Sequence, residues 1–201
     1  MPKQTASQTV GPYFAYGLTP DTQQGIRYNG FTGNELTTEA TEGEQVVIEG
    51  QVLDGEGNPV NDSMIEIWQA NAAGRYRHAE DDRADVALDD SFTGFGRTGT
   101  DANGMFRFHT VKPGAVPGRG NALQAPHVMV CVFARGMLSH AYTRLYFSDE
   151  QAANDADPVL EKVDPARRST LIAQRTEALG RVVYRLDIRL QGAGETVFFD
   201  V

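Results

Sequence analysis

Histidine and tyrosine side chains are the residues of this sequence whose types and spacing could do metal chemistry. His127 stands in the run APHVMVCVF at 125–133, and Met129 follows two positions later. Residues two apart on a strand point to the same face, so a His-x-His pair would direct two imidazoles at one metal ion. Methionine leaves two interpretations. Either the histidine was never a ligand, or the chain has the outline of a metal site that it cannot complete.

The other histidines, His78, His109 and His140, show neither HxH nor HxxxH spacing. Tyr76 and His78 share a face if their segment is extended. A self-sufficient metal site built from Tyr76, His78, His127 and an N-terminal tyrosine is one interpretation of these residues. The alternative is a set of isolated histidines that are simply hydrogen-bonded.

Three further motifs have simple structural explanations. Residues 94–99 (GFGRTG) match the dinucleotide pattern GxGxxG, but no helix is predicted after them, so we expect a strand start with glycines that relieve crowding. Asp54, Glu56 and Asn58 alternate like calcium ligands, but the downstream glutamate and glycine of a calcium loop are missing, which indicates a turn. The acidic stretch 80–85 is typical of a solvated loop.

Two segments could bind a small ligand. Arg135 follows the apolar run of His127, where an arginine can bind a carboxylate through two hydrogen bonds or form a structural ion pair. The run TVGPYF at 9–14 joins a Gly-Pro turn to aromatic residues. It is either a packing element or an arm that presents a hydroxyl and a ring to a ligand. Both alternatives remain open at the level of the residues.

Composition limits the classes of function. A chain of 201 residues suits one domain. A formal charge of −9, from 27 acidic and 18 basic residues, repels nucleic acid and anionic membranes, so an anionic substrate would need local cations. Cys131 is the single cysteine and can form no internal disulfide, and no apolar run approaches the roughly 20 residues of a membrane span. We expect a soluble protein of the reducing cytoplasm.

Short β-branched and aromatic runs closed by Gly, Asp or Asn turns predict an all-β fold, a β-sandwich. Residues 1–44 are polar and Thr- and Gly-rich, which predicts an extended N-terminal arm, either mobile or laid along another surface, before a sandwich domain at 45–201. Strands are predicted at 45–53, 63–69, 105–111, 126–134 (buried on both faces), 141–147, 181–191 and 195–200, with short surface helices at 149–155 (capped by Ser148) and 165–174 and a long loop at 112–124.

Five segments, taken in order, resemble the intradiol ring-cleaving dioxygenases: SQTVGPYF, IEIWQANAAGRYRH, FGRTGTDANGMFRFHTVKPGAVPGR, APHVMVCVFARG and TRLYFSDE. The resemblance spans nearly the whole chain and implies a β-sandwich. In catalytic members it implies a non-haem Fe³⁺ held by two tyrosines and two histidines, a ligand set suited to a hard cation. The closing YRLDIRLQGAGETVFFDV and the N-terminal GPY are similar to the chain without iron in two-chain members that cleave protocatechuate.

The resemblance allows each ligand to be tested by position. One tyrosine would fall in the loop 80–88, which contains none. The second would fall in the KPGxYPW-like segment, where Val116 stands. The histidines would fall in an AHIHF-like strand, where His127 is kept and Met129 replaces the other. We therefore expect no metal on this chain, with His127 a vestigial metal position, because valine and a thioether cannot replace a phenolate and an imidazole on Fe³⁺.

The resemblance further implies a partner, a homologous β subunit that holds Fe³⁺ and cleaves protocatechuate with O₂ to 3-carboxy-cis,cis-muconate in a hetero-oligomer of several such pairs. Thr9, Gly11, Pro12 and Tyr13 would line the substrate cavity. Arg135 would lie near the site and offset the charge of the substrate. A ferric dioxygenase acting alone and a non-catalytic β-sandwich binding module are the rival functions.

Overall fold

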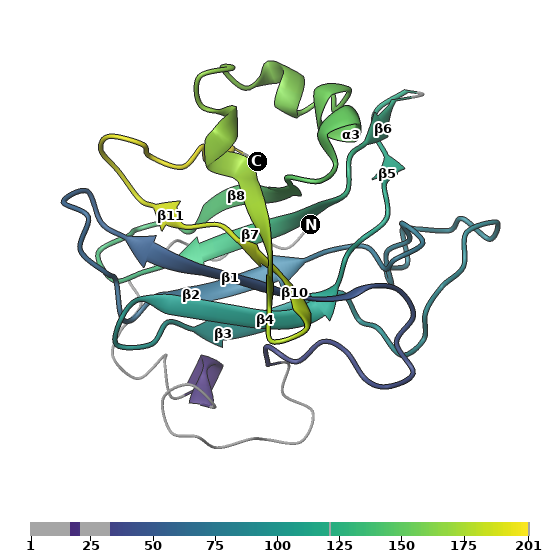
Figure 1. The fold of residues 1–201 in the computed structure, drawn as a ribbon, viewed down its shortest axis with the longest axis horizontal. Helices are drawn as coiled ribbons and strands as arrows, with labels where there is room; N and C mark the ends of the chain where they lie inside the picture. The colour runs from purple at the N-terminus through teal and green to yellow at the C-terminus, as the bar shows by residue number, and fades with distance from the viewer. Residues whose placement is uncertain (1–16, 21–32, 121, 201) are drawn as a thin grey trace, which may run out of the picture.

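A computed structural model of the chain describes residues 17–20, 33–120 and 122–200, and strands dominate it (Figure 1). Nine strands form one mixed sheet in the order β11-β1-β10-β9-β8-β7-β2-β3, with β4 also paired to β1, and β5 and β6 form a separate hairpin. The strands are β1 (Gln45–Leu53), β2 (Met64–Trp68), β3 (Phe95–Gly99), β4 (Met105–Val111), β5 (Val116–Pro117), β6 (Leu123–Gln124), β7 (His127–Phe133), β8 (Ala141–Phe147), β9 (Ile172–Ala178), β10 (Arg181–Arg185) and β11 (Ile188–Arg189).

The core joins strands that are far apart in the sheet order. Apolar side chains of β1 and β4, such as Ile48 and Phe108, belong to the same buried cluster as Ile67 of β2 and Val130 of β7. Each of these strands alternates buried and less buried residues, the pattern of a strand that turns one face to a core. The all-β expectation is therefore confirmed.

Strand β7 is buried mainly on one face, contrary to the prediction of burial on both. Val128, Val130 and Val132 are at most 3% exposed and point into the core. His127 is buried on the opposite face, but Met129 and the residues that follow it on that face are only half-buried. This second face is therefore partly open between β2 and β8, the two neighbours of β7.

Two predictions near the C-terminus are wrong. Residues 165–174 do not form a helix: a short 3-10 helix, η2 (Arg168–Leu171), leads directly into β9. The residues of β9 past Ala173 are exposed, so the sequence shows no apolar alternation there. Backbone hydrogen bonds to β10 keep these residues in the sheet. Residues 195–200 make only an isolated bridge, Tyr142–Phe199, in place of a strand.

The predicted helix at 149–155 is confirmed in a shorter form, α3 (Gln151–Asp155). Its N-cap is Glu150 and makes no side-chain cap bond, so the predicted cap at Ser148 is wrong. The Ser148 hydroxyl instead accepts the backbone N–H of Arg175 at 3.0 Å. Glu150 and Asp149 form ion pairs with Lys112. A second 3-10 helix, η1 (Leu160–Lys162), follows α3 (Figure 1).

The glycine-rich motif at 94–99 and the possible calcium motif at 54–58 are both structural, as predicted. Gly94 has φ +76°, and a Cβ there would lie 2.3 Å from the carbonyl oxygen of Gln69, so β3 begins where only glycine fits. Asp54 accepts the backbone N–H groups of Glu56 at 2.9 Å and Asn58 at 2.8 Å, which is an Asx turn rather than a calcium loop.

Residues 33–44, which the sequence assigned to the arm, include residues that pack against the sheet of this same chain. The backbone N–H of Leu36 donates to His109 O at 2.8 Å, and His109 N–H donates to Asn34 O at 2.8 Å. Leu36 itself is 7% exposed and joins the core. Among the described residues, no helix is long and apolar enough to cross a membrane.

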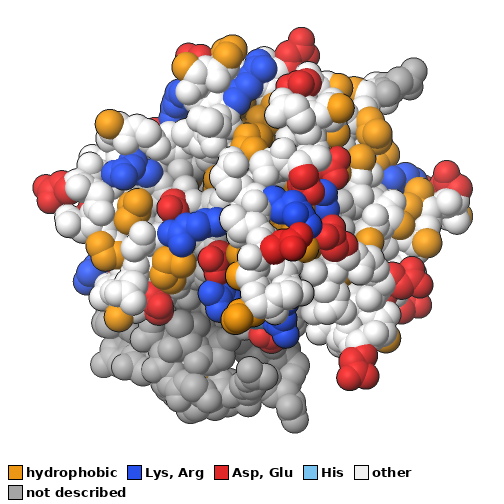
Figure 2. All heavy atoms as spheres, in the orientation of Figure 1, with side chains coloured by type: hydrophobic (Ala, Val, Ile, Leu, Met, Phe, Trp, Pro, Cys, Tyr) orange, Lys and Arg blue, Asp and Glu red, His pale blue; other side chains and the backbone are white. Residues whose placement is uncertain are grey.

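Figure 2 shows acidic and basic side chains interspersed on the face drawn. The net charge of −9 is thus not spread as one uniform acidic surface on this face. The Lys112 contacts described above are one such local pairing: its amino group lies 2.9 Å from Asp149 Oδ2 and 2.6 Å from Glu150 Oε1.

Candidate functional site

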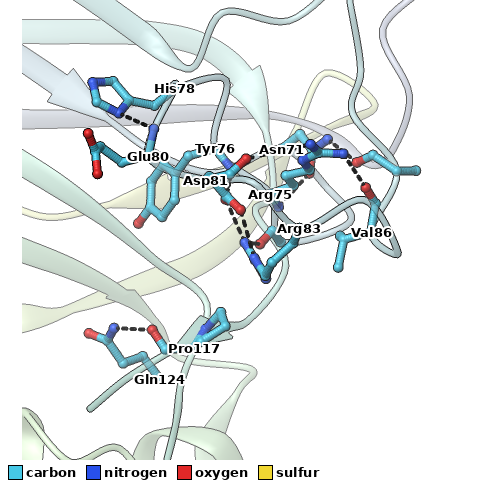
Figure 3. A network of polar contacts seen from close by, with 12 residues as sticks. Asn71, Arg75, Tyr76, His78, Glu80, Asp81, Arg83, Val86, Pro117 and Gln124 are labelled. Carbon is cyan, nitrogen blue, oxygen red and sulfur yellow. Dashed lines mark hydrogen bonds and ion pairs between the residues drawn. The ribbon is translucent and has the colours of Figure 1, made fainter. Parts of the chain in front are cut away.

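A pocket of about 420 Å³ opens where the loop after β2 meets the β5–β6 hairpin. Its lining combines aromatic rings from the end of β2 and the following loop with an acidic segment and the first strand of the hairpin. The residues are Trp68, Tyr76, His78, Glu80, Asp81, Asp82, Arg83, Val116 and Pro117. Figure 3 shows the loop residues grouped on one side and Pro117 with Gln124 on the other.

Three aromatic rings form one wall. Trp68 and Tyr76 stack with ring centroids 5.8 Å apart and an angle of 12° between planes, and His78 meets Trp68 edge-on at 6.4 Å. The Nδ1 of His78 accepts the backbone N–H of Glu80 at 3.2 Å (Figure 3). Tyr76 and His78 therefore do point to the same side, as predicted, but they pack on a tryptophan.

Asp81 organises the acidic segment, so the prediction of a solvated loop is wrong at this residue. Its side chain is only 9% exposed and accepts two hydrogen bonds from Arg83, at 2.6 and 2.8 Å, and one from the backbone N–H of Tyr76 at 2.8 Å (Figure 3). The bond from Arg83, opposed by burial, lowers the pKa of Asp81 to about 2. Asp81 is a structural carboxylate and is not available as a proton donor near neutral pH.

His127, which is not among the residues that line the pocket, is buried in a neutral form. It is 4% exposed, its Nδ1 lies 2.8 Å from Ala125 O, and its ring packs on Tyr146 with centroids 5.8 Å apart. Contact with a carbonyl oxygen requires the proton on Nδ1, which leaves Nε2 unprotonated. Burial, reinforced by the positive charge of Arg144, lowers the pKa of His127 from 6.5 to about 4.

Arg144 was not singled out from the sequence, yet it lies at the centre of this region. It is the Cα partner of Met129 across β7 and β8, so the two side chains share a face. Its Nη1 donates to Gln124 Oε1 at 2.8 Å and to the Tyr146 hydroxyl at 3.2 Å. The only available signal was an arginine in the otherwise apolar or hydroxyl-bearing strand AYTRLYF.

Burial raises the pKa of Tyr76, and the charge of Arg144 opposes that effect. Burial also raises the pKa of Tyr146, again opposed by Arg144. Both phenols are therefore neutral near pH 7, where a tyrosine of normal pKa is already protonated. A phenolate is the form in which tyrosine would bind a ferric ion.

Arg135 lies at the other end of β7 from His127, in the turn after Phe133. Its Nε is 3.0 Å from Asp62 Oδ2, which is the ion pair considered from the sequence, and its side chain is 73% exposed. The structure thus does not bring Arg135 and His127 together. Four predicted substrate-site residues, Thr9, Gly11, Pro12 and Tyr13, lie outside the described residues.

The histidines do not converge either. His109 Nε2 is 3.6 Å from Glu35, while the His140 ring packs at a tilt against Phe133 and edge-on against Tyr142. Within residues 17–20, 33–120 and 122–200 there is no group of three or more His, Cys, Asp or Glu side chains that could hold a metal ion. These positions give no support for the interpretation of a self-sufficient metal site.

The sequence family described as Dioxygenase (Dioxygenase_C) matches residues 10–192, which is most of the chain. The chain belongs to the intradiol dioxygenase family. It is 52% identical over 202 residues to the protocatechuate 3,4-dioxygenase alpha chain of Burkholderia cepacia, covering 99% of this chain and 98% of that protein. It is also 39% identical over 160 residues to the beta chain from the same organism, covering 77% of this chain and 67% of that protein.

Solved structures agree with this membership. The dioxygenase domain of a dioxygenase–carbohydrate-binding fusion from Streptomyces sp. SirexAA-E superimposes with a TM-score of 0.60 at 26% identity, covering 87% of this chain and 99% of that one. The chain therefore has the intradiol dioxygenase fold.

The residues at the family's iron-ligand positions do not fit a ferric ion in this chain. Val116 is 3% exposed and lines the pocket with an aliphatic side chain. Met129 lies between its Cα partners Trp68 and Arg144 and offers a thioether. The loop 80–88 contributes carboxylates and no phenol, and its Asp81 is already bound to Arg83. His127 alone offers a suitable nitrogen.

Proposed function

We propose that this chain is the α-type subunit of a two-chain protocatechuate 3,4-dioxygenase and that a homologous β-type chain holds the catalytic Fe³⁺. The observation that carries the proposal is the 52% identity, over 99% of the chain, to an alpha chain of that name. The absence of donors at Val116 and Met129 supports it, because a subunit without iron ligands contributes to catalysis only through the site of a partner.

The reaction of the complex is cleavage of protocatechuate between its two hydroxyl-bearing carbons, with both atoms of O₂ entering the product 3-carboxy-cis,cis-muconate. Bound to the β-type chain, Fe³⁺ supplies the electronic path between the catechol ring and O₂. This chain contributes binding, orientation and exclusion of water from the shared cavity. No residue of this chain is assigned the role of acid, base or nucleophile.

Substrate contacts from this chain come from two places in our proposal. Thr9, Gly11, Pro12 and Tyr13 border the aromatic ring of the substrate. The Arg135 guanidinium offsets the charge of its carboxylate. The 73% exposure of Arg135 supports this role, because its ion pair with Asp62 leaves the side chain accessible to a partner's ligand.

The proposed complex also assigns a role in assembly to each part of this chain. Residues 1–44 form an N-terminal arm, of which 33–44 lie on their own sheet and the preceding residues reach the partner. Residues 45–201 form the β-sandwich domain, in a hetero-oligomer of several α/β pairs in the cytoplasm. A free thiol at Cys131, whose pKa burial and Glu66 raise to about 12, suits a reducing compartment.

Co-expression with the homologous β-type chain from the same genome tests the proposal. The two chains should co-purify as a coloured complex that contains one iron per pair, consumes O₂ with protocatechuate and forms 3-carboxy-cis,cis-muconate, followed by absorbance. The chain expressed alone should contain no stoichiometric iron and show no activity. Iron and ring cleavage in the chain alone, or failure of the two chains to associate, would refute the proposal.

A further inference from the structure

The two family ligand positions that lost their donors are joined in this chain by one side chain. Arg144 is the Cα partner of Met129 across β7 and β8. Its Nη1 donates to Gln124 at 2.8 Å, and Gln124 is the Cα partner of Val116 across β5 and β6. The guanidinium is therefore connected to both positions.

We infer that the Arg144 guanidinium takes the place of a metal ion between these two positions. It supplies a positive charge fixed to the chain, links the strands that a metal would link, and excludes a free cation. The inference rests on family membership and on these contacts. It does not rest on the proposed pairing with an iron-bearing chain.

The hydrogen bonds of Arg144 support the linking role. Gln124 Oε1 belongs to β6 and the Tyr146 hydroxyl to β8, so Nη1 holds the hairpin against the main sheet. The Tyr146 hydroxyl in turn donates to Asp157 Oδ1 at 3.2 Å, which extends the connection to the segment before η1. A bound cation connects elements in the same way, through oxygen atoms drawn from several strands.

The charge of Arg144 supports the excluding role. In the described parts of the chain no carboxylate forms an ion pair with Arg144, and the two acceptors given above are neutral. A guanidinium keeps its charge at any physiological pH. In a half-buried site a second cation nearby would be repelled more strongly than in water, so restored donors alone would not bring a metal back.

Paired variants of the full-length chain separate the effect of the charge from that of the donors. Met129→His places a second imidazole two positions from His127, whose unprotonated Nε2 can act as a ligand. We expect M129H/R144Q to bind Co²⁺ about tenfold or more tightly than M129H. The triple variant V116Y/M129H/R144Q should bind more tightly than V116Y/M129H. M129H/R144K keeps the charge and should resemble M129H.

The readout is quenching of Trp68 fluorescence by Co²⁺, together with metal content after dialysis. Trp68 is the single tryptophan and the Cα partner of residue 129, so quenching reports binding at this place. Wild type and R144Q are the controls for binding elsewhere. Circular dichroism and melting temperature check the fold of each variant. If the buried V116Y change prevents folding, the half-buried M129H pair decides.

Equal Co²⁺ affinity of M129H and M129H/R144Q would overturn the inference, as would tight binding by M129H or M129H/R144K. Absence of binding in every folded variant that carries R144Q would also overturn it, because Arg144 would then not be what excludes the metal. None of these outcomes depends on catalytic activity. Failure of this inference therefore leaves the proposed two-chain function untouched, and the reverse also holds.

Discussion

The Asp157 carboxylate accepts the backbone N–H of Ala125 at 2.8 Å and so fixes the start of β7, two residues before His127. Asp157 is fully buried, and its other oxygen accepts the N–H groups of Val159 at 2.8 Å and Leu160 at 2.9 Å. Because the His127 ring bonds Ala125 O, the carboxylate sets the position of the imidazole without touching it. One buried acid thus fixes the backbone segment that orients His127.

Replacing Asp157 tests how much its hydrogen bonds contribute to the stability of the fold. We expect Asp157→Asn to lower the free energy of unfolding by about 2–4 kcal/mol, because the amide nitrogen would face backbone N–H donors in a buried place. Urea denaturation followed by fluorescence measures the loss. The matched control is Asp155→Asn, at an exposed residue of α3 whose side chain bonds only Gln151 in the part described. An equal effect of the two changes would contradict the role of Asp157.

Acid should destabilise the chain through His127. Its folded pKa of about 4 lies below the ordinary 6.5, so between these values the unfolded chain binds a proton that the folded chain does not. Stability is then full above pH 6.5 and falls by roughly 3 kcal/mol as the pH drops to 4. Urea denaturation across this range should show this fall in stability for wild type and for His140→Gln. The fall should be much smaller for His127→Gln. An unchanged fall in His127→Gln would refute the assignment.

Arg135 should affect substrate binding and leave iron unchanged. In the complex with the β-type chain, Arg135→Ala should raise the KM for protocatechuate about tenfold or more, the loss expected for charge-assisted hydrogen bonds to a carboxylate. Asp62→Ala removes the same ion pair but keeps the guanidinium, so its KM should stay near that of wild type. Iron analysis accompanies the kinetics. Loss of iron in Arg135→Ala would instead indicate a structural role.

Deleting residues 1–14 should impair association with the β-type chain, or activity, more than it impairs folding of this chain. Among the described residues, the core is built mainly from strands that begin at Gln45, together with Leu36. Melting temperature of the chain alone and ring-cleavage activity of the complex are the two measurements. Unchanged activity with unchanged melting would count against the arm as a substrate-lining segment.

The sequence predicts strands where side chains alternate, and it fails where backbone pairing alone makes the strand. β1, β4 and β8 match the predicted ranges because each carries a regular apolar face. The first residues of β9 were assigned to a predicted helix at 165–174 and the rest to no element, because the residues past Ala173 are exposed and no apolar face marks the strand. The bounds of α3 moved because Asp149 and Glu150 bind Lys112 instead of the helix N-terminus.

Some features of the candidate site can likewise be predicted from the sequence, whereas others depend on the fold. The loss of donors at Val116 and Met129 can be read from residue types once the family is recognised, since coordination depends on the atoms present. Arg144 could not be found from the sequence, because its importance comes from the register that places it opposite Met129. Asp81 was missed for a similar reason. Its bonds with Arg83 and with the backbone N–H of Tyr76 distinguish it from its neighbours in the acidic segment, and these bonds depend on the fold.

Strand β9 has a role that extends to the whole molecule. Its first residues pair with β8 through Tyr146–Ile172 and Phe147–Ala173, and the rest pairs with β10, which pairs with β1. Detaching β9 would therefore open two hydrogen-bonded ladders together. We expect thermal and urea denaturation to proceed in a single cooperative step, so that a destabilising substitution in the pocket lowers the stability of the whole sheet.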